Sequence, residues 1–219
     1  MFQKLDVTDL EATGAVLAVF ARHAGGNIDI LFNNAGIDSK GYFDKTSWHE
    51  IMNIINVNLI TGANLKHRVI PILKVTAGSL CISTSSGSTT FGAPGMAAYS
   101  ATKHAIKGLT EALSVELQPY GVRVVDLIPG IIDTGMLPEE IKTFVPKEGM
   151  WRMMHAESVA DTVWQAYQGG KLHWYIPEEL HNYDVEITAS PEKMRNRELP
   201  ERYIMAQLTP SSLSVDLAS

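Results

Sequence analysis

The sequence has a single cysteine, Cys81, among its 219 residues, so no disulfide can form within the chain. It also lacks any apolar run near the ~18 to 20 residues that a membrane-spanning helix needs, and its first residues do not resemble a secretion signal. Basic residues are outnumbered, with 18 Lys and Arg against 24 Asp and Glu. Because binding to phosphate backbones requires a basic excess, we expect no nucleic-acid binding. Together with the single cysteine and the missing membrane and secretion segments, this favours a cytoplasmic protein that does not bind a membrane.

Several catalytic signatures are missing as well. The seven histidines include no HExxH motif and no paired spacing suited to a metal, so no metal site is predicted. No GxSxG elbow precedes a helix, which argues against a serine hydrolase. What remains is an ordinary globular composition, 45% hydrophobic and 19% charged, with a length that suits one domain.

Helical and strand patterns alternate along the chain. Helices are predicted over 9–24, 48–71, 98–118 and 157–168, and strands over 28–32, 79–83, 122–128 and 172–176. Capping boxes, Thr8 with Glu11 and Ser47 with Glu50, open the first two helices. Apolar strands separated by helices are typical of a parallel sheet covered on both faces. We expect one domain over 1–188 and a polar extension over 189–219.

The residues that suggest chemistry are Ser85, Ser86, Tyr99 and Lys103. On a helix, positions 99 and 103 share a face with Cβ atoms ~5 to 6 Å apart. A lysine ammonium at that distance favours a phenolate, so we expect it to lower the Tyr99 pKa from ~10 toward the range of a general acid or base. A serine after the preceding strand can reach the same point, since the carboxyl ends of parallel strands converge. By itself the pair could equally be a solvated helix face.

The surrounding segment, AAYSATKHAIKGLTEALSVEL, resembles the short-chain dehydrogenase/reductase family, whose Tyr-x-x-x-Lys motif it contains as Tyr99 to Lys103. Further signatures follow the family's order and are Asp6-Val7, Asn33-Asn34-Ala35-Gly36, Asn58, and the segment from Pro129 and Gly130 to Thr134. The resemblance spans residues 6–134. It implies a Rossmann-like α/β fold of the classical type, a doubly wound parallel sheet in three layers.

The resemblance also implies roles. Tyr99 would be the general acid or base, and Lys103 would lower its pKa and bind the nicotinamide ribose. Ser86 would donate to the substrate carbonyl oxygen, with Ser85 as the alternative. Asn58 would hold a proton-relaying water, although an asparagine within a helix can instead bond a backbone carbonyl. The residues implied in binding NAD or NADP are Asp6, Val7, Asn34, Ala35, Gly36, Tyr99, Lys103, Pro129, Gly130, Ile132 and Thr134; Gly36 and Gly130 could equally be turn residues.

The chain departs from the family pattern in one respect. It contains no TGxxxGxG loop, and a whole βαβ unit of ~30 or more residues, which would bind the pyrophosphate, is not found. Without that unit, strand 28–32 would present an unpaired hydrophobic edge. We therefore expect an N-terminally truncated sheet and favour a fragment or mis-started reading of a longer protein.

These features favour an NAD(P)-dependent oxidoreductase that interconverts a secondary alcohol and a ketone. Apolar residues over 134–151 would suit a hydrophobic substrate, or they could simply pack a short helix. The alternative function is a non-catalytic remnant that serves as a binding or dimerisation module. The resemblance implies a homodimer or homotetramer formed through helices 48–71 and 98–118.

Overall fold

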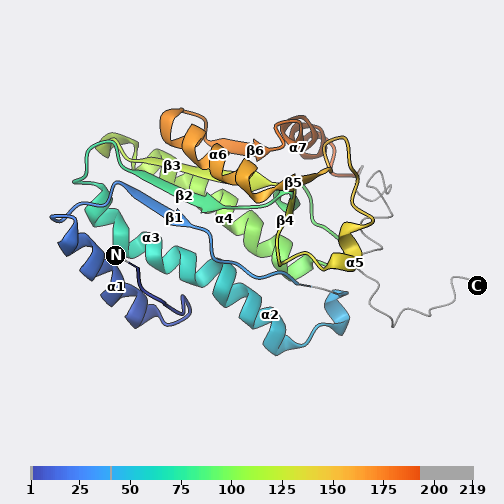
Figure 1. Ribbon diagram of the computed structural model, residues 1–219, viewed down its shortest axis with the longest axis horizontal. Coiled ribbons are helices and arrows are strands. Elements are labelled where there is room, and N and C mark those ends of the chain that lie inside the picture. The colour runs from blue at the N-terminus through green and yellow to red at the C-terminus, as the bar shows by residue number, and fades with distance from the viewer. Residues whose placement is uncertain (1, 40, 193–219) are drawn as a thin grey trace, which may run out of the picture.

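The computed structural model describes residues 2–39 and 41–192. Its centre is a parallel four-stranded sheet in the order β1-β2-β3-β6 (Figure 1). The strands are β1 (Ile30–Asn33), β2 (Leu80–Thr84), β3 (Arg123–Pro129) and β6 (His173–Ile176). Two short strands, β4 (Ile131–Asp133) and β5 (Met153–His155), form a separate parallel pair. The predicted α/β fold with a parallel sheet is confirmed, and each main strand begins one or two residues later than the sequence pattern indicated.

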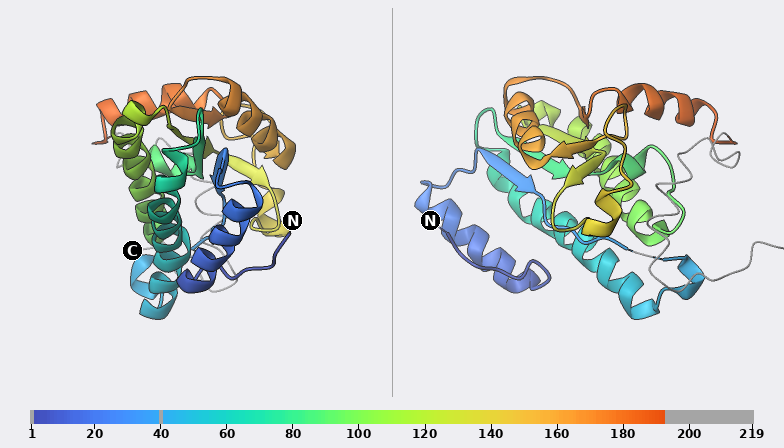
Figure 2. Two further views of the ribbon diagram at one scale, coloured as in Figure 1. Left: turned by 90° about the vertical axis from the view of Figure 1, so that its left-hand side faces the viewer. Right: turned by 45° about the vertical axis from the view of Figure 1, so that its right-hand side comes forward.

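Helices cover both faces of the sheet. They are α1 (Leu10–His23), α2 (Trp48–Ile55), α3 (Thr61–Leu73), α4 (Ala97–Glu116), α5 (Glu139–Lys142), α6 (Ala156–Gln168) and α7 (Leu180–Ala189). Helices α1 and α3 lie below the sheet in Figure 1 and α6 lies above it, while α4 packs into the same core as α3. Figure 2 shows the same two helical layers from other sides. This is the three-layer arrangement that the motifs implied.

Each face of the sheet has its own apolar core. On one face, β2 and β3 pack through Cys81 and Val124 against Leu73 of α3 and Leu113 of α4. On the other face, residues such as Ile82 and Leu127 pack against α6. Both faces of the central strands are therefore buried, as is usual for parallel sheets.

The helix boundaries include three corrections. The N-cap of α1 is Asp9, whose carboxylate accepts from the Ala12 N–H, whereas the predicted cap, Thr8, donates its hydroxyl to Asp6. The predicted 48–71 helix is interrupted by a π-helical turn over Asn56–Ile60, although Ser47 does cap its start. Helix α7 lies where no element was predicted, and residues 193–219 of the expected extension are outside the described part of the chain.

Strand β1 forms an edge of the sheet. Ile30 and Phe32 on this strand are each 39% exposed. Within residues 2–39 and 41–192, no strand pairs with the outer edge of β1, so the unpaired apolar edge expected from the sequence is present. No helix in the same residues has the length and hydropathy to cross a bilayer.

Candidate active site

A cavity of about 640 Å³ lies at the carboxyl ends of β1, β2 and β3. Its volume falls within the range of small-molecule sites, ~300 to 1,000 Å³. Most of the candidate residues line it, namely Asn34, Ala35, Gly36, Ser86, Tyr99, Lys103, Pro129, Gly130, Ile132 and Thr134. Residues that are more than 90 positions apart in the sequence thus meet where parallel strands end, as the crevice rule for open α/β sheets predicts.

Three polar side chains converge on this cavity. The Ser86 side chain interacts with the Tyr99 phenol and favours its ionised form. The Lys103 ammonium lies 5.5 Å from the centre of the Tyr99 ring, one helical turn along α4, and donates to the Thr84 carbonyl oxygen at 2.8 Å. Tyr99 and Lys103 are 8% and 5% exposed. The shared helix face predicted from the spacing is confirmed.

The two candidate serines are held differently. Ser85 is buried, and its hydroxyl donates to the Asp126 carboxylate at 2.7 Å, away from Tyr99. Ser86 faces the phenol and accepts from the Ser88 N–H at 3.1 Å. Both serines line the cavity. Because the Ser85 hydroxyl is engaged by Asp126, Ser86 is the serine positioned to act with Tyr99.

The pKa of Tyr99 is raised, so the predicted lowering was wrong. Burial raises the pKa of Tyr99 to about 12; the Ser86 hydrogen bond opposes this rise and the Asp38 carboxylate adds to it. Burial also lowers the pKa of Lys103 to about 8, with Asp38 favouring its charged form. Desolvation outweighs the Ser86 hydrogen bond at Tyr99 and the Asp38 charge at Lys103, because both side chains are almost wholly removed from water. Tyr99 is therefore a neutral phenol, a proton donor, at neutral pH.

Asn58 sits in the π-helical turn, and its amide is bound to the backbone of Ile37. Its Oδ1 accepts from the Ile37 N–H at 2.8 Å, and its Nδ2 donates to the Ile37 carbonyl at 2.9 Å. The alternative noted for an asparagine within a helix, a bond to a backbone carbonyl, is thus observed. These bonds tie the π-helical turn before α3 to Ile37, the residue that follows Gly36. π-Helical turns are frequent at functional sites, and this one orients Asn58 toward that loop.

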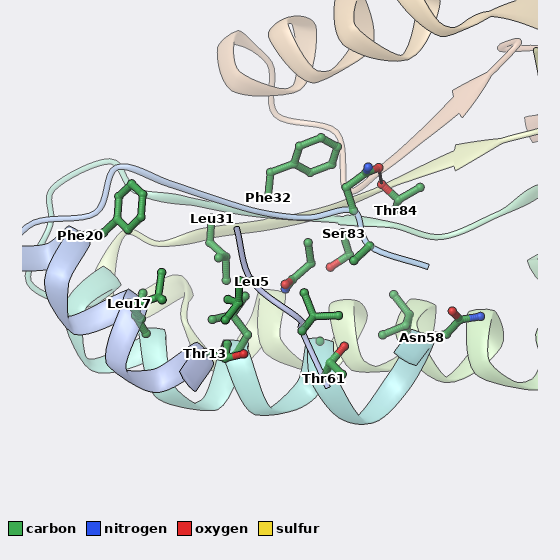
Figure 3. Close-up of a pocket in the computed structure, with 18 of the residues that line it drawn as sticks. Leu5, Thr13, Leu17, Phe20, Leu31, Phe32, Asn58, Thr61, Ser83 and Thr84 are labelled. Carbon is green, nitrogen blue, oxygen red and sulfur yellow. Dashed lines mark hydrogen bonds between the residues drawn. The ribbon is translucent and has the colours of Figure 1, made fainter. Parts of the chain in front are cut away.

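A second, smaller cavity of about 230 Å³ lies between α1, β1 and α3 (Figure 3). Asn58 and Val7 line it, and it shares Phe32, Thr84 and Lys103 with the larger cavity. Asp6 lines neither cavity; its carboxylate instead accepts hydrogen bonds from Thr8. Val7 lines the smaller cavity together with the candidates Asn34, Ala35 and Lys103, so among the cofactor-binding candidates only Asp6 lines neither cavity.

Two glycines line the cavity in different surroundings. A Cβ at Gly130 would lie 3.1 Å from the Leu180 side chain of α7, so a side chain there would require Leu180 to shift. A Cβ at Gly36 would lie 3.4 Å from Asn58 Oδ1 and 3.5 Å from the Lys103 ammonium, which are ordinary contact distances. Packing therefore constrains Gly130 more tightly than Gly36.

Two residues near the site were missed by the sequence analysis. Asp38 lines the cavity and acts electrostatically on both Tyr99 and Lys103. Its signal was its position two residues after the Asn-Asn-Ala-Gly motif. Asp126 is fully buried within β3, and its signal was a carboxylate inside an otherwise apolar strand. Such a group requires buried partners.

Comparison with known families gives a match over residues 1–143 to the family model described as short chain dehydrogenase. The chain belongs to the short-chain dehydrogenase family. It is 36% identical over 137 residues to a trans-4-hydroxycyclohexanecarboxylate dehydrogenase of Sinomonas cyclohexanicum, covering 62% of this chain and 52% of that protein. It is 34% identical over 163 residues to a 3alpha-hydroxysteroid dehydrogenase of Mediterraneibacter gnavus, covering 73% of this chain and 64% of that protein. This family member therefore spans only about half to two thirds of these curated relatives.

Solved structures agree on the fold. The structure titled "ElxO with NADP Bound" is 26% identical and has a TM-score of 0.72, covering 80% of this short-chain dehydrogenase chain and 76% of that one. A short-chain dehydrogenase from Burkholderia cenocepacia J2315 in complex with NADP has a TM-score of 0.74 at 24% identity, covering 91% and 80%. At 24% identity, the similarity to the Burkholderia cenocepacia structure supports only the Rossmann-like fold.

Proposed function

We propose that this chain carries the catalytic part of an NAD(P)-dependent oxidoreductase that interconverts a secondary alcohol and a ketone. One observation carries the proposal, the convergence of Ser86, Tyr99 and Lys103 on a single cavity. A phenol donor, a hydroxyl and an ammonium around one point suit a carbonyl that gains negative charge on its oxygen as it is reduced. The match to named dehydrogenases supports the same reaction class.

In this proposal, Tyr99 gives its proton to the carbonyl oxygen during reduction and receives it back during oxidation. Ser86 donates a hydrogen bond to the same oxygen. The Lys103 ammonium stabilises the phenolate that Tyr99 becomes, while Thr84 fixes its position through a 2.8 Å hydrogen bond. Asn58 orients the loop at Ile37 through its two hydrogen bonds. It would also bind a water molecule that passes a proton toward Lys103.

The cavity also suits a nicotinamide dinucleotide at its reactive end. We infer that Asn34, Ala35, Gly36, Pro129, Ile132 and Thr134 contact the nicotinamide half of NAD or NADP, since they line the cavity around Tyr99 and Lys103. When bound, the nicotinamide supplies or accepts the hydride.

The substrate is proposed to be a bulky apolar alcohol or ketone. Met96, Met136, Leu137 and Val159 line the cavity, and adaptable methionine side chains suit an irregular hydrophobic ligand. The names of two relatives, a hydroxysteroid and a hydroxycyclohexanecarboxylate dehydrogenase, agree with a secondary alcohol on a ring.

The decisive experiment is Tyr99→Phe, with Tyr120→Phe as the matched control, because Tyr120 is 51% exposed and does not line the cavity. Loss of the phenol should reduce turnover of a cyclic ketone with NADPH or NADH by about 10³-fold or more, since it removes the proton donor. The dissociation constant of the dinucleotide, measured by isothermal titration, should stay within about threefold because the ring remains. Unchanged kcat in Tyr99→Phe would refute the mechanism.

We further propose that two copies associate through the outer face of α4. Ala101, Gly108 and Ala112 are exposed on this face, and their small side chains permit close helix contact. Gly108→Lys should convert a dimer into a monomer in size-exclusion chromatography with light scattering, because a charged side chain would be buried at the contact. Gly170→Lys is the control, since this exposed glycine lies outside α4. An unchanged mass in Gly108→Lys would argue against this surface.

A further inference from the structure

A buried carboxylate, that of Asp126, lies against Ser85, the residue that follows β2. Asp126 of β3 is 0% exposed, and both of its oxygens are hydrogen-bonded. The Ser85 hydroxyl donates to Oδ2 at 2.7 Å. The His173 ring on β6 lies 2.6 Å from Oδ1 through Nδ1, which assigns the proton to Nδ1 because a carboxylate only accepts. The other ring nitrogen of His173 lies 3.4 Å from Glu111 of α4.

The consequence of this arrangement falls on the neighbouring residue, Ser86. Two bonds hold Ser85 to β3, one from its hydroxyl to Asp126 and one from its N–H to the Leu127 carbonyl at 2.8 Å. Ser86 has an extended backbone, with φ −167° and ψ 156°. Successive side chains of an extended segment point to opposite sides. Fixing Ser85 toward β3 therefore turns the Ser86 hydroxyl toward Tyr99.

Such a bond is costly to break at this position. A buried carboxylate that loses a donor keeps an unsatisfied acceptor, and a buried serine whose partner is removed has no water to replace it. The loop over Gly87–Thr89 follows immediately, so rotation of Ser85 would carry Ser86 with it. Asp126 is therefore placed to stabilise one orientation of the loop against others.

We propose that Asp126, acting through Ser85, is a positioning residue that sets the orientation of the Ser86 hydroxyl toward Tyr99. The inference rests on the proposed function for the roles of Ser86 and Tyr99, but the geometry it describes exists in the absence of turnover. His173 and Glu111 extend the chain of polar contacts from the site to the surface of α4. The Ser86 hydrogen bond opposes the rise in the Tyr99 pKa that burial causes, so the same contact influences the proton donor.

The test reads the Tyr99 phenol directly. In protein labelled with ¹³C at tyrosine Cζ, the Tyr99 resonance reports the hydrogen bond at its hydroxyl, and Tyr99→Phe assigns it among the 7 tyrosines. Ser86→Ala gives the shift expected when the bond is lost. We expect Ser85→Ala and Asp126→Ala to move the Tyr99 resonance most of the way to the Ser86→Ala position. A wild-type resonance in both variants would overturn the proposal.

Two further variants separate positioning from loss of stability. Asp126→Asn should keep the wild-type resonance, because its amide oxygen accepts from Ser85 and its N–H₂ donates to the other tautomer of His173. Asp184→Asn is the matched control, a buried carboxylate on α7 that bonds Lys107 and Tyr175, and it should shift Tyr175 without shifting Tyr99. If Asp126→Ala does not fold, Ser85→Ala decides, since it removes only a hydroxyl.

Turnover gives a second readout. Where the wild-type chain reduces a ketone, Ser85→Ala and Asp126→Ala should lower kcat by about tenfold to a hundredfold, as small misplacements of catalytic groups do, with the dinucleotide dissociation constant within about threefold of wild type. An unchanged kcat alongside a shifted Tyr99 resonance would overturn the catalytic importance of the positioning. If the wild-type chain shows no turnover, the proposed function fails, whereas the resonance still decides whether Asp126 orients Ser86.

Discussion

Two buried lysines lie beneath the same sheet, and only one of them faces a cavity. Lys103 of α4 is 5% exposed, lines the large cavity, and donates to the Thr84 carbonyl at 2.8 Å. Lys66 of α3 is 1% exposed, and its ammonium has no hydrogen-bond partner in the described part of the chain. Burial lowers the pKa of both, while Asp38 favours the charged form of Lys103 and Asp126 that of Lys66. Burial with a lowered pKa is therefore shared by both lysines, and proximity to Tyr99 is what distinguishes Lys103, the lysine we propose to act in catalysis.

The largest expected difference is in catalysis. Lys103→Met should lower kcat/KM for ketone reduction by about 10³-fold, since it removes the charge that stabilises the developing phenolate. Lys66→Met should leave kcat/KM within about threefold, because Lys66 lines neither cavity. Steady-state kinetics on both variants measures this contrast. Equal losses would show that the two lysines act as one electrostatic unit.

The next effect is on stability, where the two lysines should behave alike. A lysine whose pKa falls from 10.5 to about 8 on folding costs stability at neutral pH. Its replacement by methionine should therefore raise the free energy of unfolding by about 3 kcal/mol at pH 7, less the loss of the Thr84 bond. The gain should be complete below pH 8 and disappear between pH 8 and 10.5, where the unfolded chain also loses the proton.

Urea denaturation of the wild type and both variants at pH 7 and pH 10 tests this expectation. Lys66→Met should raise stability in the same direction, since burial also dominates its pKa shift. A lower free energy of unfolding in Lys66→Met at pH 7 would mean that the ammonium has a stabilising partner in solution.

The smallest effect concerns pH dependence. The proposed mechanism of reduction requires protonated Tyr99, with a pKa of about 12, and protonated Lys103, with a pKa of about 8. The rate of reduction should thus be flat below pH 7 and fall about tenfold per pH unit well above 8, following Lys103. A pH profile of kcat/KM for reduction measures this, and a flat profile to pH 10 would contradict it.

Charge changes should move that profile in opposite directions. The Lys66 charge lowers the pKa of Lys103, so Lys66→Met should shift the fall to slightly higher pH. Asp38 raises the pKa of Lys103, so Asp38→Asn should shift it to lower pH. If both variants shifted the fall in rate in the same direction, a change in the burial of Lys103 would explain the result, and the charges of Lys66 and Asp38 would not.

The parts of this molecule that depend on local pattern were predictable. Short apolar runs between amphipathic segments predicted all four strands of the main sheet. The four-residue spacing of Tyr99 and Lys103 predicted that these two side chains share one face of a helix. Helix α7 was missed because its sequence lies beside prolines and polar residues that suggest a loop. The N-cap of α1 was misplaced by one residue because Thr8 and Asp9 are both good caps. The Thr8 hydroxyl donates to the Asp6 carboxylate, and the Asp9 carboxylate caps the helix.

The amino-acid sequence alone determined the order of the four main strands and most of the residue types gathered at the cavity, because periodicity and motif spacing are local properties of the chain. Only the tertiary structure decided that Ser86 faces Tyr99 while Ser85 binds Asp126, and that burial raises the Tyr99 pKa against the predicted direction. Hydrogen-bond partners and desolvation depend on segments far apart in the sequence, 41 residues for Ser85 and Asp126 and 77 for Lys107 and Asp184. Their free energies are set by contacts that exist only once the strands and helices have packed.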